Sequence, residues 1–226
     1  MLLLARDEEG DPRGMADAQL RDEVLTIFLA GHETSANALG WTWHLLAEHP
    51  AVEARLHAEL DAVLGNRLPA CDDLPRLEYT RMVFQEALRR FPPAWVIGRL
   101  ALEDHQLGEV RVPAGAMVVI SKYLVHHDAR FFADPFAFEP ERWRSGRQED
   151  KPRFAYFPFG GGPRSCVGEA FAWMEGVLVV AAIAADWQFR SVPSHPLELQ
   201  PRFTLRPRHG ITMTAERRGA RAALSP

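Results

Sequence analysis

Residues Phe157–Gly168 read FPFGGGPRSCVG, a short stretch that combines three consecutive glycines with an arginine and a cysteine. A helical pattern begins directly after it, at Glu169, so Cys166 lies where the positive end of a helix dipole stabilises a thiolate. The glycines allow the backbone to approach a flat or bulky ligand without side-chain clash. Arg164 can pair with a carboxylate or a phosphate. The stretch therefore predicts a ligand-binding loop with one reactive thiol.

Several kinds of site can be compared with this loop. A lone cysteine is most often a buried structural residue, and that alternative stays open for Cys166. A phosphate-binding loop requires Gly-Lys followed by Ser or Thr, but residues 163–166 read PRSC. Zinc requires further cysteines or histidines at short spacing, and none lies nearby in the sequence. Haem fits these residues, since its iron accepts one axial thiolate, its propionates need cations such as Arg164, and Phe159 offers an apolar face.

A long helix is predicted over residues 17–49, where apolar side chains return at three- and four-residue steps. We expect Asp17 to cap its N-terminus, and Pro50 to end it and to lie in the first turn of the next helix. At about 1.5 Å per residue this helix would be roughly 45 Å long, which exceeds the diameter of a small domain. We therefore expect it to cross a larger domain than this chain supplies.

The middle of this helix reads AGHETS, at residues 30–35. His32 and Glu33 begin like the zinc motif His-Glu-x-x-His, but position 36 is alanine, so the zinc alternative fails. A Glu-Thr pair in a helix is usually solvated surface. Here the pair interrupts a helix that otherwise faces a core, Gly31 leaves space, and the Thr34 hydroxyl can compete for backbone hydrogen bonds.

A charged pair lies in a further helix, predicted over residues 77–91. Glu86 and Arg89 are three positions apart, and such a pair by itself is a surface ion pair worth a few tenths of a kcal/mol. The segment FEPERW follows at residues 138–143 and contains Arg142.

Together these motifs resemble the cytochrome P-450 monooxygenases. The pattern Phe-x-x-Gly-x-Arg-x-Cys-x-Gly, at residues 159–168, is similar to the family's haem-binding loop. Residues 30–34 resemble its oxygen-binding helix, and residues 86–89 and 138–143 resemble its Glu-x-x-Arg and Pro-Glu-Arg segments. The motifs come in the family's order, and the sequence is closest to soluble bacterial members. The resemblance implies a mainly α fold with a small β portion, the C-terminal half of the cytochrome P-450 fold, over residues 1–226.

The resemblance also implies a role for each site residue. Cys166 would be the axial ligand of the iron of haem b. Thr34 would hold water and dioxygen beside the iron, and Glu33 would help to relay protons. Arg99, which taken alone is a solvated strand residue, would pair with a haem propionate. The residues implied to contact the cofactor are Ala30, Gly31, Arg99, Phe159, Gly160, Gly162, Arg164, Cys166 and Gly168. A buried structural charge network would consist of Glu86, Arg89 and Arg142.

The function that this resemblance implies is that of a haem-thiolate monooxygenase. Such an enzyme activates O2 and inserts one oxygen atom into an organic small-molecule substrate, with electrons from NAD(P)H through a ferredoxin or flavoprotein reductase. The alternative is a truncated, non-catalytic fragment that binds haem weakly or not at all, because the N-terminal half of the family's fold is not in this sequence.

Composition limits the class of protein. The chain has 226 residues, 47% apolar and 25% charged, with a formal net charge of −4, so it has ordinary globular usage and no basic nucleic-acid footprint. The N-terminal MLLLARDEEG is too short for a signal peptide, and the longest apolar run, residues 177–185, is too short for a membrane span. Two cysteines, Cys71 and Cys166, indicate a reducing compartment. We expect a cytoplasmic protein with no nucleic-acid partner and no membrane segment in this chain.

The remaining elements are predicted from periodicity and turn residues. Further helices are expected at residues 52–64, ending at Gly65, and at residues 169–185. Short strands are expected within residues 95–102, 108–112 and 116–121, and a hairpin over residues 203–214. Loops are expected at residues 66–75 and 126–156, and a disordered tail at residues 217–226.

Overall fold

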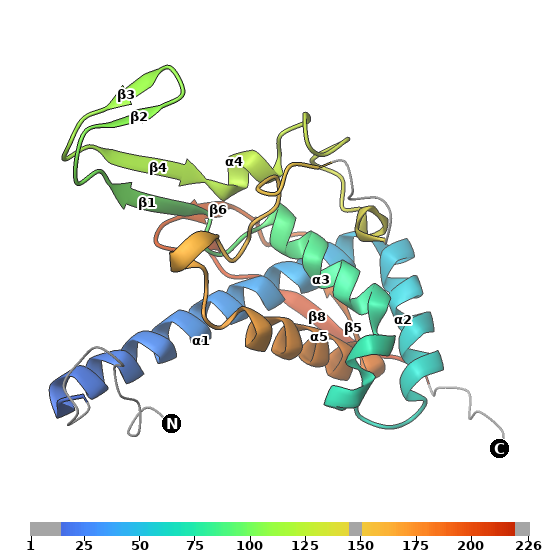
Figure 1. The fold of residues 1–226 in the computed structure, drawn as a ribbon. Coiled ribbons are helices and arrows are strands. Elements are labelled where there is room, and N and C mark those ends of the chain that lie inside the picture. The colour runs from blue at the N-terminus through green and yellow to red at the C-terminus, as the bar shows by residue number, and fades with distance from the viewer. Residues whose placement is uncertain (1–14, 145–150, 220–226) are drawn as a thin grey trace.

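The computed structural model describes residues 15–144 and 151–219. The protein is mainly helical, with short antiparallel strand pairs around the helices (Figure 1). Its α-helices are α1 (Asp17–Glu48), α2 (Pro50–Leu64), α3 (Glu78–Arg90), α4 (Lys122–His126) and α5 (Glu169–Asp186). Its strands are β1 (Val96–Leu100), β2 (His105–Leu107), β3 (Val110–Val112), β4 (Met117–Ser121), β5 (Trp187–Ser191), β6 (Leu199–Pro201), β7 (Leu205–Pro207) and β8 (Met213–Arg217). Short 3₁₀ helices are η2 (Cys71–Arg76), η3 (Pro140–Trp143) and η4 (Gly162–Arg164).

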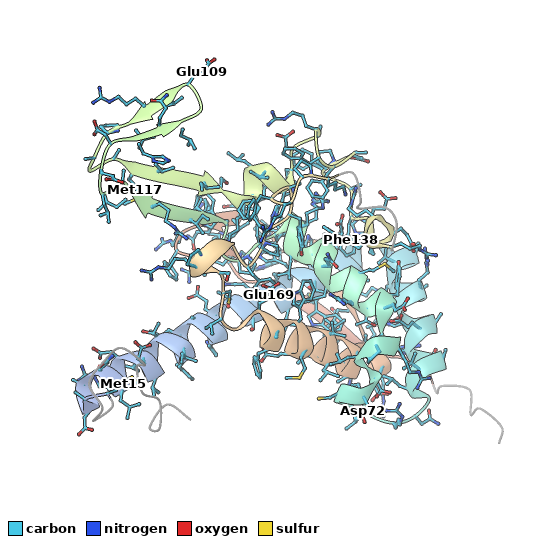
Figure 2. All side chains as sticks on the ribbon, in the orientation of Figure 1. Met15, Asp72, Glu109, Met117, Phe138 and Glu169 are labelled. Atoms are coloured by element: carbon cyan, nitrogen blue, oxygen red, sulfur yellow. The ribbon has the colours of Figure 1, made fainter. Side chains whose placement is uncertain are left out.

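Helix α1 has two different environments along its length. Its C-terminal half is buried, with Trp41 fully enclosed and its ring stacked on Phe91 at 4.3 Å between centroids. Its N-terminal half projects away from the other helices, with Met15 beyond its far end (Figure 2). Large apolar side chains are exposed along this half, namely Val24, Leu25, Ile27, Phe28 and Leu29. The 32-residue helix therefore extends well beyond the core to which its other half belongs.

The core lies where α1, α2, α3 and α5 pack together. Helices α3 and α5 approach closely at Gly176, because a Cβ atom there would lie 2.3 Å from Cε1 of Phe84. Only glycine permits this approach without displacing the phenyl ring. Pro50 begins α2, as predicted, and Gly65 follows its last residue with a left-handed φ of 56°.

The strands form two-stranded antiparallel pairs, β1 with β4, β2 with β3, β5 with β8, and β6 with β7. The first two pairs form an arm that projects from the helices, with Glu109 and Met117 on it (Figures 1 and 2). In the pair that leads to α4, Val96 lies opposite Ser121. This register places the end of β4, and therefore the start of α4, beside the helical core.

The hairpin predicted over residues 203–214 is wrong. Strand β7 pairs with β6 and β8 pairs with β5, so the two strands of this segment belong to different sheets. Their partners, and also β2, were not predicted. Each of these strands is short, and its pairing is decided by contacts with distant residues that local alternation does not reveal.

Three predicted boundaries also change. The cap of α1 is Ala16, because Asp17 already belongs to the helix. The loop predicted at residues 66–75 contains most of η2, because the Asp73 carboxylate accepts hydrogen bonds from Arg67 and from the backbone of Ala70 and so closes the turn. The tail predicted from residue 217 begins later, since Arg217 ends β8 and the Arg218 backbone donates to Asp186 at 2.8 Å. Residues 220–226 lie outside the described residues.

Candidate functional site

The cysteine loop is a tight turn that leads into α5. The backbone N–H of Cys166 donates to the carbonyl of Phe159 at 2.9 Å, which closes the loop across its base. Gly160 and Gly162 adopt left-handed φ values of 80° and 72°, which favour glycine at both positions. The Cys166 side chain is exposed, as is Arg164. The loop therefore presents its thiol to the outside and close to the N-terminus of a helix.

A cleft of about 420 Å³ lies beside this loop. One wall is the loop backbone, and here Gly161 leaves room for the Phe154 ring, because a Cβ atom would lie 2.5 Å from its Cε1. Phe159, which is half-buried, packs near Trp173 of α5 at 5.7 Å between ring centroids. Glu169 lies at the start of α5 (Figure 2) and also lines the cleft. Aromatic side chains thus support the loop from α5.

The AGHETS segment lies near the middle of α1 and is joined to α5. The Ser35 hydroxyl donates to Glu175 of α5 at 2.8 Å. The Thr34 hydroxyl donates to the carbonyl of Ala30 at 2.6 Å, the backbone hydrogen bond that the sequence suggested. Gly31 is exposed, and apart from its chain neighbours and the adjacent backbone of α1, no atom lies within 4 Å of the position that its Cβ would occupy. The exposed surface of α1 at this point is therefore open.

Glu33 is held by a residue that sequence reasoning missed. Thr204, which is buried between β6 and β7, donates its hydroxyl to Glu33 Oε1 at 2.6 Å. The Asn37 amide in turn donates to the Thr204 hydroxyl at 3.3 Å. No sequence signal could have found Thr204, because the hydrogen bond joins residues that are 171 positions apart.

The structure brings Glu86, Arg89 and Arg142 together in the core. Glu86 and Arg89 are both 0% exposed. Arg89 donates to both carboxylate oxygens of Glu86, at 2.7 and 2.9 Å, and Arg142 donates to Oε1 at 2.9 Å. The Trp143 indole and the Glu139 backbone complete the set of donors to this carboxylate, at 2.7 and 3.1 Å. This group of residues, the Glu86 network, links α3 to η3.

Arg99 lies on β1 opposite Val118 of β4, and its side chain is exposed. Its guanidinium donates to the carbonyl of Gly98 at 2.8 Å. Sequence reasoning missed two other residues near the loop, Lys122 and His126 of α4. They hydrogen-bond to Pro158 and Phe157, at the start of the loop. Their spacing of four positions in an apolar helix was a signal, because it places both side chains on one helix face.

The residues of the loop fit a haem. The Cys166 thiol is exposed next to apolar side chains that are also exposed, Val167 by 97% and Phe171 by 61%. Arg99 and Arg164 are exposed cations that suit carboxylates. Among residues 15–144 and 151–219, no group of three or more His, Cys, Asp or Glu side chains could hold a metal ion. In a haem, the porphyrin would supply the remaining ring ligands to an iron bound by Cys166.

The described helices were also compared with membrane spans. In residues 15–144 and 151–219, no helix combines the length and the apolar character that a bilayer crossing requires.

Comparison with known proteins gives a consistent result. The family model described as Cytochrome P450 matches residues 1–214. Cyclooctatin synthase of Streptomyces melanosporofaciens is 45% identical over 204 residues, which cover 90% of this chain and 44% of that protein. Putative cytochrome P450 132 of Mycobacterium tuberculosis is 44% identical, over 88% of this chain and 43% of that protein. Pentalenene oxygenase of Streptomyces avermitilis is 39% identical, over 91% and 48%. The chain thus spans less than half the length of these relatives.

Proposed function

Because this chain belongs to the cytochrome P450 family, we propose that it is the haem-binding part of a haem-thiolate monooxygenase. The observation that supports this most directly is the exposed Cys166 thiol, held at the N-terminus of α5 by a loop with left-handed glycines. The complete enzyme would use O2 and electrons from NAD(P)H, delivered by a ferredoxin or a flavoprotein reductase, to oxidise an organic small molecule.

The cofactor that we propose is haem b, bound through Cys166. Covalent attachment of the haem c type requires Cys-x-x-Cys-His, and Cys71 and Cys166 are far apart in the sequence. When bound, haem supplies the iron chemistry that activates dioxygen, and an axial thiolate favours cleavage of the O–O bond. Arg99 and Arg164 would bind the propionates, because both guanidinium groups are exposed. Gly160 and Gly162 would leave room for the ring beside the loop.

Glu33 and Thr34 would manage protons on the α1 side of the cofactor. Glu33 Oε1 is occupied by the Thr204 hydroxyl, so the carboxylate would exchange a proton at Oε2. Thr34 Oγ1 gives its own proton to the carbonyl of Ala30, so its lone pairs would accept a hydrogen bond from water. Gly31 would leave the space in which such a water lies.

The substrate class that we propose is an apolar small molecule. Two relatives are named for oxidising such compounds, a pentalenene oxygenase and a cyclooctat-9-en-7-ol 5-monooxygenase. We also propose a cytoplasmic location, because Cys71 and Cys166 are both free and a reducing compartment keeps thiols in that form.

A second candidate is a non-catalytic fragment that binds haem weakly or not at all. It is favoured by the exposed apolar side chains on the N-terminal half of α1, which would pack against other residues in a longer protein.

A carbon monoxide difference spectrum separates these candidates. The 226-residue chain is expressed with added haem, purified and reduced, and its Cys166→Ser variant is compared with Cys71→Ser as a matched control. A strongly red-shifted Soret band that is lost only in Cys166→Ser supports the proposed function. Equal spectra for wild type and Cys166→Ser contradict the ligand assignment, and a chain without haem supports the fragment.

A further inference from the structure

Helix α4 directs two buried side chains at the first residues of the cysteine loop. Lys122 and His126 lie four positions apart and so share one face of this short helix. They are 3% and 0% exposed. Lys122 Nζ donates to the carbonyl of Pro158 at 2.8 Å, and the backbone N–H of Phe157 donates to His126 Nε2 at 3.1 Å. One helix face therefore holds two consecutive residues at the start of the cysteine loop.

Helix α4 also makes hydrogen bonds with α3 and with the segment before β1. Arg89, which binds Glu86, donates from Nη1 to the carbonyl of His126 at 2.8 Å. The backbone of Tyr123 donates to the carbonyl of Trp95, just before β1. A continuous set of hydrogen bonds thus leads from the Glu86 network through α4 to Phe157 and Pro158. The next residue, Phe159, accepts the hydrogen bond from the Cys166 backbone.

We propose that Lys122 and His126 are positioning residues that hold Phe157 and Pro158, at the start of the cysteine loop, and thereby fix the position of the Cys166 thiol. We call this pair the α4 clamp. Its consequence for haem ligation rests on the proposed function. The effect on the loop itself does not.

The chemistry of His126 supports this role. Burial lowers the pKa of His126 to about 3, so the ring is neutral at physiological pH and Nε2 can accept a proton from a backbone amide. The other nitrogen, Nδ1, has no hydrogen-bond partner among the described residues, although it is buried. An unpaired buried donor is costly, and an apolar side chain of similar size would avoid that cost. The hydrogen bond from the Phe157 backbone to Nε2 offsets part of that cost.

Lys122 is also costly to bury. Burial lowers its pKa to about 8, an effect that the nearby Cys166 opposes. Among the described residues, the Lys122 ammonium donates a hydrogen bond to the carbonyl of Pro158.

The direct test is hydrogen–deuterium exchange in the 226-residue chain without haem. We expect Lys122→Met and His126→Leu each to speed exchange of the Gly160, Ser165 and Cys166 amides by about tenfold, while α3 amides keep their protection. The chain offers matched controls. Lys151 is the other lysine of the sequence, and His127 contacts Tyr123 rather than the loop, so Lys151→Met and His127→Leu should leave loop exchange unchanged.

Conservative variants keep the test decisive if a truncation prevents folding. In His126→Gln an amide oxygen can accept from Phe157, and in Lys122→Arg a guanidinium can donate to Pro158, so both should give loop exchange within about threefold of wild type. Loop exchange in Lys122→Met and His126→Leu that matches the controls would overturn the clamp. So would loss of protection in α3 and the loop to the same degree, in either the truncated or the conservative variants, because it would show a merely global effect.

Haem binding gives a second, separate readout. If the chain binds haem, we expect Lys122→Met and His126→Leu to move part of the carbon monoxide Soret band from the thiolate position to that of a neutral ligand. The control variants should retain the wild-type band. A wild-type chain that binds no haem would count against the proposed function, while the exchange experiment would still decide the clamp.

Discussion

The Thr204 hydroxyl donates a 2.6 Å hydrogen bond to the Glu33 carboxylate, across 171 positions of sequence. Thr204 lies in the turn between β6 and β7, and Glu33 lies near the middle of α1. The exposed carboxylate is therefore oriented by a buried hydroxyl from the C-terminal part of the chain. An acid that is positioned in this way keeps one oxygen fixed and the other accessible.

Removing that hydroxyl should release the carboxylate. We expect Thr204→Val to lower the free energy of unfolding by about 1–2 kcal/mol, because the bonds to Glu33 and Asn37 are lost inside a buried turn. Urea denaturation measures the change. Thr204→Ser keeps the hydroxyl and is the control. A loss in Thr204→Ser with none in Thr204→Val would mean that packing of the Thr204 methyl group, and not its hydroxyl, stabilises the turn.

The Glu86 network should be the most sensitive point of the core. We expect Glu86→Gln to destabilise the fold by roughly 3–5 kcal/mol, since it leaves Arg89 and Arg142 buried without their shared counter-charge. The control is Glu139→Gln, whose side chain is half-exposed and pairs with Arg142 at 3.4 Å. It should cost less than about 1 kcal/mol. Similar denaturation midpoints for the two variants would contradict a central role for Glu86.

Two glycines in helices should respond to alanine in opposite ways. Gly176→Ala places a methyl group against the Phe84 ring, so we expect a loss of about 1–3 kcal/mol. Gly31→Ala meets open space and improves helix propensity, so we expect a gain of up to about 1 kcal/mol. Thermal unfolding of the two variants measures both. A stabilising Gly176→Ala would show that α3 and α5 can separate at no cost.

Stability should fall as the solution becomes acidic, because of His126. Its pKa is lowered to about 3 in the fold by burial and stands near 6.5 in an unfolded chain, so the unfolded state takes up the proton first as the pH falls. The stabilising contribution is therefore complete above pH 6.5 and is lost progressively towards pH 3. The slope should be on the order of 1.4 kcal/mol per pH unit for this one group.

His126→Gln tests that assignment, because glutamine does not titrate in this range. Urea denaturation between pH 7 and pH 4 should show a shallower decline for the variant. His127 acts in the same direction, since burial lowers its pKa to about 4. Stability should therefore depend even less on pH in a double variant with glutamine at both positions. A wild-type slope that persists in His126→Gln would assign the effect to other groups.

The sequence predicted most of the helices because apolar periodicity within one helix is a local property. Residues such as Trp41 and Leu45 repeat at helical spacing and lie on the buried side of α1. The strands were harder, since β5 pairs with β8 across the intervening β6 and β7. Nothing in residues 203–214 indicates that their partners lie elsewhere in the chain.

The candidate site shows the same division. The cysteine loop and its glycines could be recognised because their spacing is local and chemically restrictive. The contact of Thr204 with Glu33 and the contacts of Lys122 and His126 with the loop join separate segments, and their geometry is decided by packing. Taken alone, Glu86 and Arg89 look like a surface pair, and only the family resemblance implied a buried network, because local spacing does not reveal burial.

The donors to the Glu86 carboxylate also emerge from the ribosome at different times during synthesis. Glu86 leaves the ribosome 53 residues before Glu139, the first donor to its carboxylate that lies outside α3, and Arg142 and Trp143 come later still. At roughly 5–20 residues per second, this gap lasts about 3–10 s. During that interval Arg89 is the one member of this set of donors that is available to the Glu86 carboxylate. The full set of hydrogen bonds to the buried Glu86 carboxylate can therefore form only after η3 has emerged.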